Sequence, residues 1–259
     1  MSESQRRRGL ALAPESNLPQ RISSWIRERV REAGADGVVV GLSGGVDSSV
    51  VAALARMALG ERLLGLIMPC QSKTSDIEDA RLVARRLGIK MKEIPLDPIY
   101  ESFLEILPPG DRLTRANLKA RLRMVTLYYY ANGLNYLVAG TGNKSELSIG
   151  YFTKYGDGGV DILPLGGLLK TEVKQLAREL RIPERIIEKI PSAGLWEDQT
   201  DEEEMGMSYE ELDRAILAIE SGDASGLTSE ILDKVAEMMK ASRHKRQPPP
   251  AFERQGKMH

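Results

Sequence analysis

One segment near the N-terminus combines glycines, hydroxyls and a carboxylate in an order suited to phosphate binding. It reads Gly41-Leu42-Ser43-Gly44-Gly45-Val46-Asp47-Ser48-Ser49 and joins an apolar run to a helical pattern. Where a strand leads into a helix, backbone amides and the helix dipole converge on an anion. Glycines at this turn let phosphate oxygens approach the backbone. Asp47 repels phosphate unless a cation lies between them, so we expect a magnesium ion there.

This loop differs from two common nucleotide-binding loops. It contains no Gly-Lys-Ser/Thr sequence, so it is not a Walker A loop, and it lacks the Gly-x-Gly-x-x-Gly pattern of dinucleotide-binding folds. A glycine-rich turn without a function is the plain alternative.

Apolar runs alternate with amphipathic helical patterns on both sides of the loop. Strands are predicted at residues 38–42, 63–68, 91–96 and 136–139, and helices at 22–30, 50–58, 75–87, 97–107, 114–132, 171–180, 184–190, 209–220 and 229–243. This alternation predicts an α/β fold with a doubly wound, mostly parallel sheet and helices on both faces. The loop then lies at the carboxyl edge of the sheet, where such folds bind ligands.

The chain is predicted to form one domain, residues 17–259, preceded by a flexible basic arm, residues 1–16. From residue 183 to 259 it is expected to be a mostly helical extension and tail. With 259 residues, of which 42% are hydrophobic, it can bury a core without a disulfide or structural metal. An acidic cluster is expected to be a solvated loop; it comprises Glu197, Asp198, Asp201, Glu202, Glu203 and Glu204.

Charge and cysteine content limit the possible partners and compartment. Lys plus Arg number 36 and Asp plus Glu 37, a balance that argues against a dedicated nucleic-acid-binding protein. The longest apolar run is far too short to cross a membrane. Cys70 is the sole cysteine, so no disulfide forms within the chain, and a reducing, cytoplasmic location is expected.

The glycine-rich loop resembles the Ser-Gly-Gly-x-Asp-Ser-Ser/Thr pyrophosphate loop of the N-type ATP pyrophosphatases, which cleave ATP between the α and β phosphates. We therefore call residues 41–49 the pyrophosphate loop. Further segments resemble, in order, those of the ammonia-dependent NAD+ synthetases. They are Asn-Leu-Lys-Ala-Arg-Leu-Arg-Met at 117–124, Gly-Thr-Gly-Asn-Lys-Ser-Glu at 140–146, Gly-Tyr-Phe-Thr-Lys-Tyr-Gly-Asp-Gly-Gly-Val-Asp at 150–161, Pro-Ser-Ala-Gly-Leu at 191–195 and His-Lys-Arg at 244–246.

This resemblance implies an adenine nucleotide alpha hydrolase-like fold and a ligase that forms a carbon–nitrogen bond. The implied reaction amidates deamido-NAD+ with ammonia to give NAD+, AMP and pyrophosphate. It proceeds through an adenylated nicotinate carboxylate, with ATP as co-substrate and Mg2+ as cofactor. The resemblance also implies a homodimer. The glutamine-dependent relatives carry an additional N-terminal amidase domain. Few residues precede the first predicted helix, so we expect that domain to be absent.

The resemblance also assigns roles to individual residues. Catalysis is implied for Asp47, Glu146 and Lys170, with Asp47 and Glu146 as the metal ligands. ATP binding is implied for Gly41, Leu42, Ser43, Gly44, Gly45, Val46, Asp47, Ser48, Thr141, Lys170 and Ser192. Binding of deamido-NAD+ is implied for Arg121, Lys154, Asp161, His244 and Lys245.

Two alternative functions remain at this point. The first is another adenylating enzyme with a pyrophosphate loop, against which the segment from Lys154 to Asp161 argues. The second is a catalytically silent nucleotide-binding or RNA-binding relative, against which the presence of both acids, Asp47 and Glu146, argues. The glycine-rich segment 151–161 and the tail at His244 and Lys245 are expected to be mobile without ligand and to close over deamido-NAD+.

Overall fold

The computed structural model describes residues 17–196 and 199–252. Its centre is a sheet of four parallel strands in the order β3-β2-β1-β4. The strands are β1 (Gly37–Gly41), β2 (Leu63–Ile67), β3 (Lys90–Glu93) and β4 (Tyr136–Ala139). Ile162 adds one parallel bridge to Ala139, outside β4. The predicted arm, residues 1–16, lies outside the described residues.

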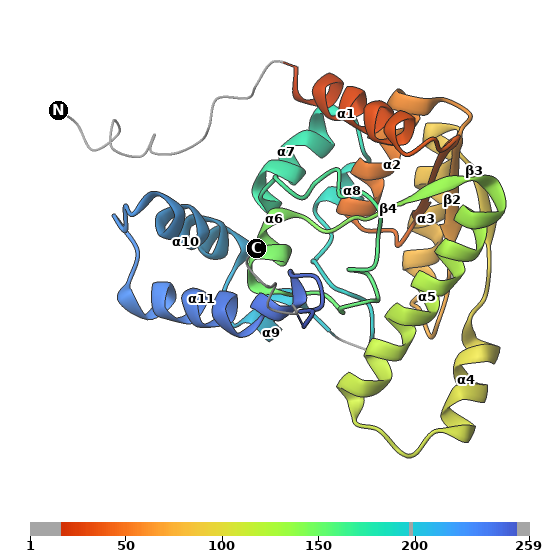
Figure 1. The fold of residues 1–259 in the computed structure, drawn as a ribbon. Coiled ribbons are helices and arrows are strands. Elements are labelled where there is room, and N and C mark those ends of the chain that lie inside the picture. The colour runs from red at the N-terminus through yellow and green to blue at the C-terminus, as the bar shows by residue number, and fades with distance from the viewer. Residues whose placement is uncertain (1–16, 197–198, 253–259) are drawn as a thin grey trace, which may run out of the picture.

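Helices cover both faces of the sheet, which confirms the predicted doubly wound α/β fold (Figure 1). On one side lie α1 (Leu18–Glu32), α2 (Val46–Leu59), α3 (Thr74–Leu87) and α7 (Lys170–Glu179); on the other lie α4 (Asp97–Ile106) and α5 (Arg112–Leu134). Side chains alternate along a strand, so Val38 and Val40 pack with α2 while Val39 packs on the opposite face. Because both faces are buried, β1 is apolar throughout.

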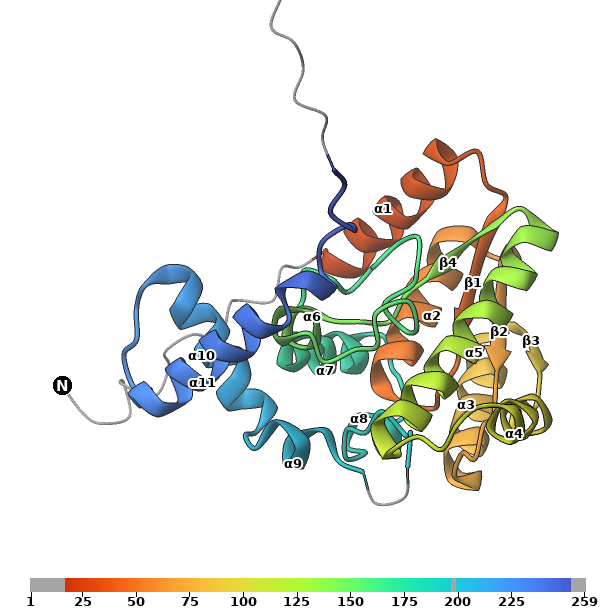
Figure 2. The ribbon, with the colours of Figure 1, turned by 60° about the horizontal axis from the view of Figure 1, so that its bottom comes forward.

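The C-terminal extension is helical and packs beside the sheet. It comprises α8 (Glu184–Ile187), α9 (Asp201–Met205), α10 (Tyr209–Ser221), α11 (Ser229–Ala241) and a 3-10 turn, Arg243–Lys245. Its apolar core includes Met205, Leu212 and Val235 and also takes in Ile149 of α6 (Lys144–Ile149). Figures 1 and 2 show α10 and α11 beside α6, on the opposite side of the molecule from β2 and β3. No helix of the described residues combines the length and apolar character needed to span a bilayer.

Two predictions in this extension were wrong. The helix predicted at 184–190 ends at Ile187, and Lys189 then reaches the carboxylates of Asp76 and Asp79. The acidic cluster is not a solvated loop throughout, because Asp201–Met205 is a helix and Asp201 is only 4% exposed. Glu197 and Asp198 lie outside the described residues. The burial of Asp201 has a physical cause, since two tyrosine hydroxyls and a backbone amide donate hydrogen bonds to it.

Candidate active site

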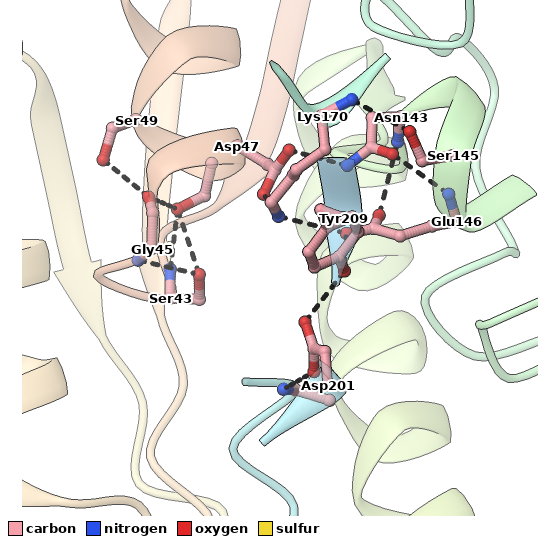
Figure 3. A network of polar contacts seen from close by, with 12 residues as sticks. Ser43, Gly45, Asp47, Ser49, Asn143, Ser145, Glu146, Lys170, Asp201 and Tyr209 are labelled. Atoms are coloured by element: carbon pink, nitrogen blue, oxygen red, sulfur yellow. Dashed lines mark hydrogen bonds and ion pairs between the residues drawn. The ribbon is translucent and has the colours of Figure 1, made fainter. Parts of the chain in front are cut away.

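The pyrophosphate loop joins β1 to α2 at the carboxyl edge of the sheet. The Ser43 and Ser48 hydroxyls lie 3.0 Å apart, and the Ser48 and Ser49 hydroxyls donate to the Gly45 carbonyl at 3.0 and 2.8 Å (Figure 3). Gly41 ends the strand, while the Leu42 and Val46 side chains are buried in the core. These two residues therefore offer only backbone groups to a phosphate.

Neighbouring elements hold the loop in place. Gly44 has a φ of +79°, and a Cβ atom added there would lie 2.3 Å from the carbonyl oxygen of Asp76 in α3. The Lys189 ammonium contacts Asp76 at 2.6 Å, Asp79 at 2.8 Å and the Gly44 carbonyl at 3.5 Å. Glycine at position 44 is thus required both by backbone conformation and by lack of space.

Four residues from three segments of the chain form what we call the Lys170 cluster: Asp47, Asn143, Glu146 and Lys170 (Figure 3). The Lys170 ammonium lies 2.5 Å from Asp47 and 3.2 Å from Glu146. The Asn143 side-chain amide donates to the other Asp47 oxygen at 2.9 Å. The structure therefore brings together the three residues to which catalysis was assigned.

Local structure explains how this cluster is positioned. Asn143 and Glu146 form a capping box at the start of α6, with bonds of 3.0 and 3.3 Å between each side chain and the other's backbone amide. Lys170 is the first residue of α7, and its backbone amide donates to the Ser145 hydroxyl at 2.9 Å. Asp213 of α10 accepts hydrogen bonds from the Thr171 amide and hydroxyl at the same helix start.

The cluster is largely buried, and both carboxylates lie within 3.2 Å of the Lys170 ammonium. Burial raises the pKa of Glu146 to about 7; Asp47 adds to this effect, while Lys170 opposes it. Burial alone would lower the pKa of Lys170, but Asp47 and Glu146 outweigh burial and raise it. Lys170 therefore stays cationic. One ammonium balances only one of the two carboxylates when both are ionised, so a further cation can be accommodated electrostatically.

A second layer of polar residues surrounds the cluster. The Tyr209 hydroxyl lies 3.0 Å from Asp201 and 3.3 Å from Glu146, and the Tyr209 ring centroid lies 4.8 Å from the Lys170 ammonium. Asp201 also accepts hydrogen bonds from the Tyr151 hydroxyl at 3.0 Å and the Ala193 amide at 2.9 Å. Asp201 thereby connects Tyr151 and Ala193 to Tyr209, which contacts the Lys170 cluster.

Sequence reasoning missed several of these residues. Asn143 stands three residues before Glu146, the spacing of a capping box, so Asn143 had a recognisable signal. Asp201, Tyr209 and Asp213 had none, because their partners come together only in the tertiary structure.

Four of the five residues assigned to deamido-NAD+ lie in one chain of contacts. Arg121 of α5 donates to the Lys154 carbonyl at 3.3 Å, and the Lys154 ammonium donates to the His244 carbonyl at 2.6 Å. The Lys245 ammonium donates to the carbonyls of Gly150 and Phe152 at 2.7 and 2.9 Å. The C-terminal turn is therefore in contact with the segment 151–161.

The other assigned residues lie apart from these contacts. Both Asp161 oxygens are occupied, one by the Tyr128 hydroxyl at 2.9 Å and one by the Val138 amide at 2.7 Å. Thr141 is half-buried after β4, and Ser192 is exposed, with its hydroxyl accepting from the Gly194 amide at 3.1 Å. Within residues 17–196 and 199–252, neither side chain donates to or accepts from the Lys170 cluster.

Comparison with known proteins identifies the family. The sequence matches the NAD synthase family over residues 18–249. It is 55% identical over 234 residues to the NH(3)-dependent NAD(+) synthetase of Archaeoglobus fulgidus, which are 89% of this chain and 94% of that protein. It is 52% identical over 235 residues to the synthetase of the same name from Carboxydothermus hydrogenoformans, again 89% and 94% of the two chains.

A solved structure shows the same fold. The NMN synthetase of Francisella tularensis superposes with a TM-score of 0.84 at 38% identity, covering 91% of this chain and 97% of that one. The sequence match spans both the pyrophosphate loop and the segment 150–161. The chain therefore belongs to the NAD synthase family.

Proposed function

We propose that this chain amidates deamido-NAD+ with ammonia at the expense of ATP, giving NAD+, AMP and pyrophosphate. The observation that carries the proposal is the Lys170 cluster, which places two acids and a buried ammonium beside a pyrophosphate loop. The names of the similar Archaeoglobus fulgidus and Carboxydothermus hydrogenoformans proteins support the same reaction.

The reaction has two steps, and neither needs a nucleophile from the protein. The nicotinate carboxylate attacks the α-phosphate of ATP, and pyrophosphate leaves. Ammonia then attacks the carboxyl carbon of the adenylate, and AMP leaves. The protein must align the reacting groups and neutralise the charge that develops on phosphate oxygens. Loop amides, serine hydroxyls and the Lys170 ammonium are groups suited to both tasks.

Asp47 and Glu146 fit a magnesium ion, because their carboxylates already converge on one cationic point, the Lys170 ammonium. The described residues contain no group of three or more His, Cys, Asp or Glu arranged for a metal. Mg2+ in nucleotide sites needs only one or two carboxylates beside substrate phosphates and water. We therefore propose these two acids as its protein ligands. When bound, the ion supplies charge neutralisation for the phosphates.

Two candidate nicotinate substrates differ in size, the dinucleotide deamido-NAD+ and nicotinate mononucleotide. One similar structure is that of an NMN synthetase, so nicotinate mononucleotide is the competing substrate. We favour deamido-NAD+, because the two relatives that carry the NAD+ synthetase name are the more similar in sequence, at 52 and 55% identity.

The decisive experiment supplies the protein with ATP, magnesium, ammonium and either nicotinate nucleotide. We expect NAD+ and AMP to form in equal amounts, with a higher kcat/KM for deamido-NAD+ than for nicotinate mononucleotide. A preference for the mononucleotide would make the chain an NMN synthetase. ATP cleavage without an amide product would contradict the proposed reaction.

We also propose that the chain forms a homodimer through α4 and α5. These helices expose large apolar side chains, with Ile106 77%, Leu113 60%, Val125 60% and Tyr129 76% exposed. Exposed apolar surface of this kind is typical of an interface. Light scattering should give twice the mass of the chain, and Val125→Glu with Tyr129→Glu should give monomers. We place the protein in the cytoplasm, because Cys70 is a buried free thiol.

A further inference from the structure

A cavity of about 300 Å3 lies at the N-terminal end of α5. Its lining shares no residue with the pyrophosphate loop, the Lys170 cluster or the segment 151–161. Cationic and aromatic side chains form much of its wall, namely Arg112, Arg115, Lys119, Tyr100 and Trp196. Its lining residues include no Asp or Glu in the part of the chain that the structure describes. The wall is therefore strongly positive.

Lys119 is the residue that indicates most clearly what kind of ligand the cavity would bind. The side chain is buried, with 4% of the residue exposed, and its ammonium donates one hydrogen bond, to the Leu195 carbonyl at 2.8 Å. It lies 5.3 Å from the Tyr100 ring centroid and forms no ion pair with a described residue. An ammonium carries three donors, so two remain for a ligand. Burial also lowers the pKa of Lys119, and it outweighs the opposing effect of nearby Cys70 and Asp97.

The two arginines extend the same positive face. Residues 112, 115 and 119 are spaced by three and four, which places them on one side of a helix. The Arg112 guanidinium lies 4.6 Å from the Trp196 ring centroid. The Arg115 guanidinium forms no hydrogen bond or ion pair with the described residues. Guanidinium groups match the paired oxygens of phosphate, and a lysine adds a point charge.

We propose that this cavity binds a small phosphate-bearing anion, at a site separate from the pyrophosphate loop. A volume of about 300 Å3 exceeds that of one phosphate group and suits a pyrophosphate or a nucleoside monophosphate. An anion there would accept the hydrogen bonds that the Lys119 ammonium does not make to the described residues. It also holds Leu195 and Trp196 against α5, and these residues follow the segment that carries Ser192.

Equilibrium dialysis of the full chain with radiolabelled pyrophosphate tests this site. The wild-type chain should bind two pyrophosphates, one at the pyrophosphate loop and one in the cavity. Lys119→Met and Arg115→Gln should each bind one. Gly45→Ala, which alters only the loop, should weaken binding at the loop and leave the cavity site unchanged. That cavity site should be lost when Gly45→Ala is combined with Arg115→Gln. Arg86→Gln, an exposed arginine of α3, is the matched control and should bind two.

The same titration with AMP distinguishes the two sources of phosphate. Binding of pyrophosphate alone at the second site assigns it to an inorganic anion, and binding of both assigns it to nucleotides as well. Because Arg115 is exposed, its substitution leaves the fold intact even if Lys119→Met does not fold. The proposal is overturned if the wild type binds neither probe at a second site. It is also overturned if Arg115→Gln binds both probes as the wild type does.

Discussion

Lys170 donates a hydrogen bond of 2.5 Å to Asp47, a residue 123 positions earlier in the chain. The Lys170 side chain is 4% exposed and the Asp47 side chain 16%. The contact joins the start of α2 to the start of α7, and so ties the pyrophosphate loop to the C-terminal half of the molecule. Removing one partner from a buried ion pair strands the other charge. The stability of the fold and the integrity of the site are therefore coupled at this pair.

The first prediction concerns the two acids. Asp47→Asn and Glu146→Gln should each lower kcat by a factor of about 100 or more, because lost charge stabilisation at such a site costs about 3 kcal/mol. Asp47→Asn should also lower the free energy of unfolding more than Glu146→Gln, since it removes the shorter contact to Lys170. Rates at saturating magnesium and urea denaturation measure both effects. Near-wild-type turnover by either variant would refute the role of that acid.

The second prediction concerns Tyr209. Tyr209→Phe keeps the ring beside Lys170 but removes the hydroxyl that contacts Asp201 and Glu146. A hydrogen bond to a charged group contributes about 1.5–3 kcal/mol, so we expect kcat to fall about tenfold or more, with little change in KM for ATP. Tyr151→Phe is the matched control, because it removes a hydroxyl from Asp201 without touching Glu146. Equal kcat values for the two variants would argue against a positioning role for Tyr209.

The third prediction concerns the segment 151–161 and the C-terminal turn. Cutting the chain after Ser242 removes the Lys245 contacts to Gly150 and Phe152 and the Lys154 contact to residue 244. We expect KM for deamido-NAD+ to rise about tenfold or more, the effect of losing one charge-assisted hydrogen bond, while KM for ATP stays nearly constant. Lys154→Ala should act in the same direction.

A chain cut after Arg246 is the control for this truncation, because it keeps the whole C-terminal turn. It should behave as the wild type. If the cut after Ser242 changed both Michaelis constants equally, or neither, the idea that these segments close over deamido-NAD+ would be abandoned.

Buried strands can be predicted from the sequence because their residues form continuous apolar runs. β1 is buried on both faces, so its valines form a continuous apolar run between glycines. The pyrophosphate loop was also predictable, since its function depends on glycines and hydroxyls at fixed local positions. Contacts within a few residues, such as the Asn143–Glu146 capping box, leave a readable spacing as well.

Contacts between distant segments leave no such record. Asp201 sits among acidic residues, which favours a solvated loop. Tyrosine hydroxyls from two other segments nevertheless donate hydrogen bonds to its oxygens, which allows it to be buried. Asp213 lies on an amphipathic helix, where a carboxylate usually faces solvent. Its burial follows from the free donors at the start of α7, which only the packed structure brings within reach.

The fourth prediction concerns the nitrogen donor. A cysteine that releases ammonia from glutamine must be an accessible thiolate. Cys70 is fully buried, and burial raises its pKa. We therefore expect this chain to form NAD+ from ammonium but not from glutamine in ammonia-free buffer, and Cys70→Ser to keep the ammonium-dependent rate. If the chain formed NAD+ from glutamine and Cys70→Ser abolished that activity, Cys70 would be the residue that releases ammonia.

The last prediction separates two adjacent glycines of the pyrophosphate loop. Gly44→Ala forces an alanine into a φ of +79° and brings its Cβ atom within 2.3 Å of the Asp76 carbonyl. The conformation alone costs about 1–2 kcal/mol, and the clash adds to it, so the free energy of unfolding should fall by about 2 kcal/mol or more. Gly45 has a φ of −95°, and a Cβ there would meet only the Ser43 hydroxyl, at 3.4 Å. Gly45→Ala should therefore fold as the wild type does.

The two variants should nevertheless both bind ATP poorly, for different reasons. In Gly44→Ala the loop itself is displaced. In Gly45→Ala the added methyl group stands at the start of α2, where a phosphate would approach the backbone amides, and we expect the Kd for ATP to rise about tenfold, a loss of about 1.4 kcal/mol. Calorimetric titration with ATP and urea denaturation of both variants measure the two quantities independently. Unchanged ATP affinity in a folded Gly45→Ala would mean that phosphate does not lie against this loop.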